Sequence, residues 1–278
     1  MRSIPVVKMS GTGNDFLMVD NRKGLLKEEE MAPLARAACP RRVSAGADGV
    51  ILVDPAKSNG HEYRMRIFNA DGSEAEMCGN GSRCCAVFAR QIGAADRTQV
   101  IETVAGTLHA ETADDGLSAK VQLSEPDTMM VREAVSVLGE SLTLYSMDTG
   151  VPHAILFVDD VAGVDVCKQG SAIRHHETYK PKGTNADFVQ LLGKNAIALH
   201  TYERGVEDET LACGTGACAA AIITALVHGY TPPIRVRVAS GDTLTIHFDP
   251  NRDAKTSSRP YLEGAVTTVY KGEYCWDS

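Results

Sequence analysis

The stretch NADGSEAEMCGNGSRCCAVFAR, residues 69–90, places Cys78 directly before a Gly-x-Gly and an apolar run that is typical of a helix. The chain repeats this arrangement in ERGVEDETLACGTGACAAAIITALVHG, residues 203–229, where Cys213 precedes a second Gly-x-Gly and a run rich in Ala and Ile. In both copies a Glu lies four residues before the cysteine, at Glu74 and Glu209. Two copies of one motif indicate an internal duplication.

Two further segments match when the halves are laid over each other with small shifts. Residues 69–71 match residues 185–187, which read Asn-Ala-Asp in both places, and residues 13–20 match residues 150–159. The two cysteines are separated by about half of the chain, as a duplication requires. Three matched segments in the same order strengthen the case for two similar halves.

The chain is long enough for two domains with good cores, since it has 278 residues. We predict one domain from residues 1–123 together with 265–278, and a second from residues 124–264. A pseudo-twofold axis between such domains would set the two thiols facing each other across a shared cleft.

The charge balance of the chain argues against nucleic acid or an anionic membrane as its partner. The 28 basic and 36 acidic residues give a formal net charge of −8, so no basic surface is expected. No window approaches the length of apolar sequence that a membrane span needs, and we expect no signal peptide because the N-terminal residues have no apolar core long enough for one. We expect a cytoplasmic protein.

Eight cysteines in a chain of this length, without an export signal, are expected to be reduced thiols. A zinc site is the alternative for such a set. However, the spacings contain neither a C-x-x-C pair nor a neighbouring His doublet, so we predict that no metal is bound. Cys84 and Cys85 lie inside an apolar run and are expected to be small core residues.

The remaining chain reads mainly as short strands joined by glycine-rich and acidic turns. We predict helices near residues 27–38 and 80–92, the first despite Pro33. The stretch that leads through His175-His176 is polar, and we expect a polar loop from Asn251 to Arg259.

A cysteine at the start of a helix lies beside unpaired amide donors and the positive end of the helix dipole, which lowers the pKa of its thiol. Two such cysteines across one cleft fit stereoinversion, because one thiolate removes a proton from carbon while the other thiol returns one on the opposite face. The glycine-rich helix starts also offer backbone amides to a carboxylate and stabilise the charge that moves onto it.

Several polar residues beside the motifs could bind the two ends of an amino acid. Asn14, Asn69 and Asn185 lie on predicted turns, where asparagine either orients a ligand or completes the turn. Glu203 and Arg204 are adjacent at the end of a predicted strand. They are either solvated charges or the partners of an ammonium and a carboxylate.

At this point the sequence resembles the diaminopimelate epimerase family over nearly its whole length. The motifs that carry the resemblance are MSGTGNDFLMVD (9–20), GADGVILV (46–53), IFNADGSEAEMCGNGSRC (67–84), TNADFV (184–189) and YERGVEDETLACGTGACA (202–219). The resemblance implies an α/β fold of two pseudo-symmetric domains, each a mixed, mostly antiparallel sheet wrapped round a central helix. It also implies an isomerase that interconverts L,L- and meso-diaminopimelate without pyridoxal phosphate or any other cofactor.

For the site, the resemblance implies that Cys78 and Cys213 are the acid/base pair. The backbone amides at the helix starts would hold the reacting carboxylate; these are at Gly79, Asn80, Gly214 and Thr215. Glu203 would take the reacting amino group, and the distal amino acid end would be held by Asn69, Asn185 and Arg204. Asn14 would lie near the reacting centre, and His153 would tune a thiol. Family members are commonly homodimers.

One position departs from the family pattern and keeps other functions open. Familiar members read G-N-P-H where this chain has Gly150-Val151-Pro152-His153, and valine cannot make the hydrogen bond that asparagine offers the distal end of the ligand. The alternative within the superfamily is a cofactor-independent racemase of another amino acid, such as a histidine racemase-like enzyme. From a different class, a non-enzymatic zinc-thiolate or redox protein is the remaining alternative.

Overall fold

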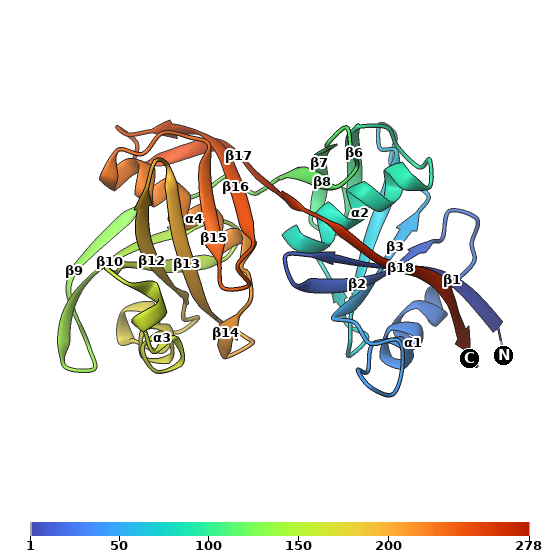
Figure 1. The fold of residues 1–278 in the computed structure, drawn as a ribbon, viewed down its shortest axis with the longest axis horizontal. Coiled ribbons are helices and arrows are strands. Elements are labelled where there is room, and N and C mark those ends of the chain that lie inside the picture. Colours follow the sequence, from blue (N-terminus) through green and yellow to red (C-terminus); the bar gives the residue numbers. More distant parts are fainter. Residues whose placement is uncertain (1, 278) are drawn as a thin grey trace. The chain divides into compact units, whose positions relative to one another are not determined.

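The computed structural model describes residues 2–277, which form two compact units (Figure 1). The first unit contains the described residues up to Val121 and from Gly264 onward, and the second is Gln122–Glu263. No helix within the described residues is long and apolar enough to cross a membrane.

The first unit is a mixed sheet of eight main strands with two helices. Strands β2–β3 and β4–β6 pair in parallel, and the other neighbouring strands in the series pair antiparallel. Short β5 (Glu74–Ala75) adds to β4. In bonded order the main strands are β18 (Thr267–Trp276), β1 (Arg2–Gly11), β2 (Asn14–Asp20), β3 (Gly49–Asp54), β4 (Tyr63–Asn69), β6 (Thr98–Thr103), β7 (Gly106–Thr112) and β8 (Ser118–Gln122). The helices are α1 (Glu28–Ala38) and α2 (Gly79–Gln91).

The second unit has the same series of pairings. The parallel pairs are β11–β12 and β13–β15, and short β14 (Asp208–Thr210) adds to β13. In bonded order its strands are β9 (Met130–Val137), β10 (Glu140–Asp148), β11 (Pro152–Phe157), β12 (Asn185–Gly193), β13 (Ala196–Glu203), β15 (Ile234–Val238), β16 (Thr243–Asn251) and β17 (Thr256–Ala265). Its helices are α3 (Val166–Arg174) and α4 (Gly214–His228), with 3₁₀ turns at Val161–Gly163 and Glu177–Tyr179.

The two series match strand for strand, including the places where parallel pairs occur. The leading strand of the second unit, β9, directly precedes β10 in the chain, whereas its counterpart in the first unit, β18, comes from the C-terminal end and pairs with β1. The predicted fold class of two duplicated mixed α/β halves is therefore confirmed.

A central helix follows each cysteine and is buried on all sides. Ten consecutive residues are buried in α2, Asn80–Ala89, and ten in α4, Gly216–Ala225. A helix that is buried on all sides needs a core around it, and here strands of the same unit supply that core. Figure 1 shows α2 lying among strands of its own unit, including β2 and β7. The outer helix of each unit packs through one apolar face only: α1 against β1 and β2, and α3 against β12 and β13.

Two polar segments are more regular than the sequence suggested. The polar stretch before His175-His176 contains α3, residues 166–174, which buries Val166, Gly170 and Ile173 at helical spacing. The expected loop from Asn251 to Arg259 was only partly right, because it is confined to the turn at residues 252–255. Strands β16 and β17 extend through most of it as a hairpin, because polar side chains suit strands that face solvent.

The prediction that residues 69–71 and 185–187 are equivalent positions in the two halves was wrong. Asn69 ends β4, whereas Asn185 begins β12, and β12 is the counterpart of β3. A three-residue match of common turn residues does not fix strand register. In the repeat, the counterpart of Asn69 is Glu203, which ends β13.

Candidate active site

Cys78 is the N-terminal cap of α2. Its backbone is extended, with φ −148° and ψ 117°, and its carbonyl accepts the first helical hydrogen bond from the Ser82 amide at 2.7 Å. The thiol is partly exposed and donates to Asn14 Oδ1 at a sulfur–oxygen distance of 3.6 Å. The sequence places a thiol where a helix start normally carries Ser, Thr or Asp, so its sulfur lies at the positive end of the helix.

Asn14 reaches Cys78 from the turn between β1 and β2. That turn needs left-handed backbone at Thr12 (φ 60°) and Gly13 (φ 83°), which explains the glycine-rich sequence. The Asn14 amide nitrogen donates to Asp48 Oδ2 at 2.6 Å, so its oxygen is the atom that faces the thiol. Asp48 was not among the predicted site residues, yet it decides how Asn14 is oriented.

Arg83 is a second residue that the sequence analysis missed. Its side chain is fully buried in α2 and donates to Thr12 Oγ1 at 2.6 Å and to Asn80 Oδ1 at 3.0 Å. These bonds fasten the β1–β2 turn to the start of α2. A Cβ on Gly11 would lie 2.9 Å from the Asn80 carbonyl oxygen, so the close approach of turn and helix requires glycine there.

Cys213 is the N-terminal cap of α4 and is buried. Its sulfur accepts the Gly216 amide at 3.4 Å and lies 3.4 Å from Thr215 Oγ1. A Cβ on Gly216 would come within 2.6 Å of Asp187 Oδ1 and 3.3 Å of the Cys213 sulfur. The glycine is therefore required for two polar groups to approach the helix start at once.

The pKa of the Cys213 thiol is raised, first by burial and then by the nearby carboxylates of Glu203 and Asp187. Hydrogen bonds from Thr215 and from the Gly216 amide act in the opposite direction but are smaller. The sequence-based expectation that a helix start lowers this pKa was wrong for Cys213. Removing water from around the thiolate raises its free energy by more than the helix end lowers it.

His153 is buried and lies between Asp187 and Thr215. Its Nδ1 is 2.6 Å from Asp187 Oδ2, and its Nε2 is 3.0 Å from Thr215 Oγ1. The predicted tuning residue thus contacts the neighbour of the thiol and not the thiol itself. Asp187 was missed, although it lies two residues after Asn185 in the motif that the sequence analysis identified.

Glu203, Asn185 and Arg204 lie together at one end of β12 and β13. The Asn185 side chain donates to the Pro152 carbonyl at 3.1 Å and accepts the Arg204 amide at 2.7 Å. Glu203 is half-buried, and burial raises the pKa of its carboxyl. Glu203 is therefore not an ordinary solvated charge.

Asn69 is exposed at the end of β4. Its side chain donates to Ser73 Oγ at 3.0 Å, and its backbone closes the same turn through the Ser73 carbonyl at 2.9 Å. The observed contacts are those of a turn residue. They leave the amide oxygen of Asn69 available to a ligand.

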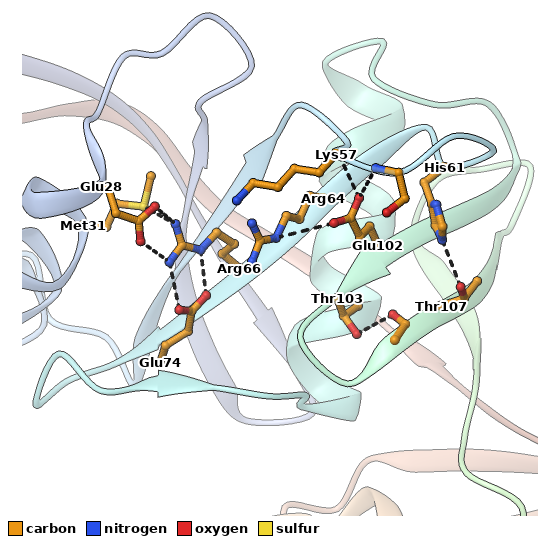
Figure 2. Close-up of polar contacts among 12 residues, drawn as sticks. Glu28, Met31, Lys57, His61, Arg64, Arg66, Glu74, Glu102, Thr103 and Thr107 are labelled. Atoms are coloured by element: carbon orange, nitrogen blue, oxygen red, sulfur yellow. Dashed lines mark hydrogen bonds and ion pairs between the residues drawn. The ribbon is translucent and has the colours of Figure 1, made fainter.

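The segment that leads to Cys78 is fastened to β4 by a buried arginine (Figure 2). Arg66 lies between Glu28 of α1 and Glu74 of β5, with nitrogen–oxygen distances of 2.6 to 2.8 Å to both carboxylates. Only 5% of its side chain is exposed. Beside it, Arg64 faces Glu102 at 4.0 Å, and Glu102 accepts the Lys57 amide at 2.8 Å.

Within the described residues, no group of three or more His, Cys, Asp or Glu side chains is arranged to hold a metal ion. The described cysteines are all free thiols.

The sequence model of the diaminopimelate epimerase family matches residues 6–129 and 145–266, which include both cysteine motifs. The chain belongs to the diaminopimelate epimerase family. It is 42% identical to the diaminopimelate epimerase of Aquifex aeolicus over 273 residues, which cover 95% of each chain. It is 39% identical to those of Hydrogenobaculum sp. (96% of this chain, 97% of the relative) and Chlorobaculum tepidum (95% and 98%).

Solved structures of more distant proteins share the fold of the diaminopimelate epimerase family. A phenazine biosynthesis protein of the PhzF family from Bacillus anthracis has a TM-score of 0.73 at 18% identity, over 99% of this chain and all of that one. A hydroxyproline epimerase from Agrobacterium vitis has a TM-score of 0.71 at 16% identity, over 100% and 94%. At these identities the likeness concerns the fold alone.

The position at which this chain departs from the family pattern has a counterpart in the other half. Phe16 pairs with the first residue of β3, and His153 pairs with the first residue of β12, so these two residues are equivalent. Asn14 and Val151 each lie two residues earlier in the chain and are therefore equivalent as well. Val151 is half-buried in the turn between β10 and β11. The first unit therefore presents an amide where the second presents an isopropyl group.

Proposed function

We infer that this protein is an isomerase that interconverts L,L- and meso-diaminopimelate without pyridoxal phosphate. The observation that carries the inference is membership of the diaminopimelate epimerase family together with a cysteine at the start of each central helix. The reaction belongs to the synthesis of lysine and of peptidoglycan precursors.

In the proposed mechanism, Cys78 and Cys213 act as the two bases. One thiolate removes the α-proton while the other cysteine, as a thiol, delivers a proton to the opposite face of the same carbon, which inverts it. The amides at the helix starts, at Gly79, Asn80, Gly214 and Thr215, would bind the carboxylate. They would also stabilise the negative charge that develops on it as the α-proton leaves.

The remaining predicted residues would bind the polar ends of the substrate. Glu203 would take the reacting ammonium, since a half-buried carboxylate gains from a cationic partner. Asn69, Asn185 and Arg204 would hold the distal end. The Asn185 side chain already donates to the Pro152 carbonyl and accepts the Arg204 amide. We therefore propose that it positions Arg204 as well as contacting the ligand.

Proton NMR of L,L-diaminopimelate in deuterated water tests this function directly. With purified protein and reductant, and without added pyridoxal phosphate or metal, the α-proton signal should disappear as the meso isomer forms. The same preparation should be analysed for zinc and titrated for free thiols. Absence of exchange with all thiols reduced would overturn the proposed substrate, and stoichiometric zinc would favour the zinc-thiolate alternative.

A second candidate function is racemisation of another amino acid, and Val151 is the observation that favours it. An apolar group at this position suits a less polar distal end than that of diaminopimelate. Incubating the protein with single amino acids in deuterated water, histidine among them, would decide. Faster α-deuteration of one of them than of diaminopimelate would establish this alternative.

We further propose a cytoplasmic homodimer that binds a small amino acid and neither nucleic acid nor membrane. Every residue of β18 from Thr267 to Glu273 is exposed, including Val269 and Tyr270, which gives a second copy an exposed strand with two large apolar side chains to contact. Sedimentation equilibrium should give twice the chain mass of 29.7 kDa. A monomer at assay concentration would contradict the proposed assembly.

A further inference from the structure

A continuous chain of hydrogen bonds leads from Cys213 through the half-buried Thr215 to the buried side chains of the second unit. The Cys213 sulfur is 3.4 Å from Thr215 Oγ1, which is 3.0 Å from His153 Nε2. On the other side of the ring, His153 Nδ1 is 2.6 Å from Asp187 Oδ2, and Thr201 donates to Asp187 Oδ1 at 2.7 Å. The side chains of His153 and Asp187 have no exposed surface.

The carboxylate fixes the direction of these bonds. An ionised Asp187 only accepts, so His153 Nδ1 carries a proton and Nε2 of the neutral ring is an acceptor. The hydroxyl of Thr215 then donates to Nε2 and can accept the S–H of Cys213. If the proton of the thiol moves to the Thr215 oxygen and the hydroxyl proton moves to Nε2, the result is a thiolate and an imidazolium, and Nε2 no longer accepts from the Asn185 amide nitrogen 3.5 Å away.

The equivalent place in the first unit shows that the fold does not require this polar pair. Around Gly216 the nearest side chains to an added Cβ are Asp187 and His153, at 2.6 and 3.2 Å. Around its counterpart Gly81 they are Ile51 and Phe16, at 2.8 and 3.3 Å. The strand registers also make these residues equivalent, because Phe16 and His153 pair with the first residues of β3 and β12.

A buried carboxylate and imidazole lose more hydration on folding than an apolar pair of similar size. The duplicated scaffold accommodates an apolar pair in one half, so the polar pair in the other half serves its cysteine. We propose that Asp187 is a positioning residue that holds His153 in the Nδ1–H tautomer, so that His153 exchanges a proton with Cys213 through Thr215. This inference rests on the proposed two-thiol function and deepens it.

Asp187→Asn is the variant that tests the proposal. Thr201 donates to Oδ1, so the new amide keeps its oxygen there and turns its NH₂ group towards His153 Nδ1. The ring must then accept at Nδ1 and carry its proton on Nε2, which reverses the bond to Thr215. We expect kcat to fall by about 10²-fold with a smaller change in KM, since proton transfer and not binding is impaired.

The tautomer of His153 provides a readout that does not depend on activity. Long-range ¹⁵N–¹H correlation spectra of protein labelled in histidine should show Nδ1–H in the wild type and Nε2–H in Asp187→Asn, with the signals assigned from His153→Gln. The matched control is Asp165→Asn, because Asp165 caps α3 through the Lys168 amide at 3.0 Å and asparagine caps equally well. The control should keep both the tautomer and kcat.

The double variant His153→Phe with Asp187→Ile copies the first unit and should fold with a wild-type melting temperature but lose epimerisation. Either an unchanged tautomer in Asp187→Asn or a kcat within about twofold of the wild type would overturn the proposal. Failure of the wild type to exchange the α-proton would instead overturn the proposed function, while the tautomer measurement would still decide the role of Asp187.

Discussion

Glu74 and Glu209 occupy the same place in the two halves of the chain. Each lies four residues before its cysteine, on a short strand that pairs with the end of a longer strand. Glu74 pairs with Phe68 and Glu209 pairs with Tyr202, each the last residue but one of its longer strand. Each also contacts a nitrogen of a basic side chain on that longer strand: Arg66 Nε at 2.6 Å and His200 Nδ1 at 2.6 Å. The conspicuous glutamates of the sequence motif therefore fasten the segment that leads to each thiol.

The variant Glu74→Gln tests this fastening. Arg66 is buried, so weakening one of its two carboxylate partners should lower the free energy of unfolding by about 1–3 kcal/mol, measured by urea denaturation. It should also lower kcat, because the residues that lead to Cys78 lose their anchor. Glu28→Gln is the matched control: it removes a charge from the same guanidinium but lies on α1, away from the motif.

The control should lose stability without a comparable loss of kcat. If the two variants have the same ratio of activity to stability, Glu74 would be an ordinary core ion pair with no effect on the thiol.

The residues of the candidate site could be predicted where a local sequence motif contains them. They could not be predicted where the pairing of distant strands brings them together. A cysteine before Gly-x-Gly and an apolar run is enough to predict a thiol at a helix start, and both copies are there. Asp48, Arg83 and Asp187 were missed because a charged residue in a single sequence looks like a surface residue. Only the folded chain brings these groups to Asn14, Asn80 and His153.

The fold shows the same division. Buried helices and strands have strong apolar patterns, and α2 and α4 begin within a residue or two of where the glycines predict. The polar segments that became α3 and β17 are held by one face only, so their patterns are weak. Strand pairing corrected the apparent match of Asn69 with Asn185, because which residues are equivalent depends on hydrogen-bond register and not on a short identical string.

Replacement of either proposed catalytic cysteine should abolish epimerisation, whereas replacement of its neighbours should not. We expect Cys78→Ala and Cys213→Ala to lower kcat by about 10³-fold or more, because each removes the only proton carrier on one face of the carbon. The matched controls are Cys84→Ala and Cys218→Ala, which alter buried thiols on the same two helices. Substantial inversion by either of the first two variants would contradict the two-base mechanism.

Val151→Asn should tighten the binding of diaminopimelate. The new amide would offer the distal end of the substrate the hydrogen bond that the family pattern provides, which is worth about 0.5–1.5 kcal/mol, or roughly a twofold to tenfold lower KM. Initial rates measured by coupled assay or NMR give the KM. Val131→Asn is the control, since Val131 is exposed on β9. A higher KM for Val151→Asn would show that this position favours a less polar substrate.

The buried thiols should make the folded protein less stable in alkaline solution. Burial raises the pKa of both Cys84 and Cys218 from 9.0 to about 12. Above about pH 9 the unfolded chain releases these protons while the folded chain keeps them, so stability falls as pH rises. Each such thiol contributes a slope of about 1.4 kcal/mol per pH unit until the folded-state pKa is reached.

Urea denaturation under reductant, from about pH 8 to about pH 10.5, measures this slope. Cys218→Ala should reduce the slope by about 1.4 kcal/mol per pH unit, because alanine has no proton to lose in the unfolded chain. Cys275→Ala is the matched control, since Cys275 is exposed near the C-terminal end of β18 and should leave the slope unchanged. Equal slopes for the wild type and Cys218→Ala would mean that the buried thiol ionises within the folded protein, and that water reaches the core around α4.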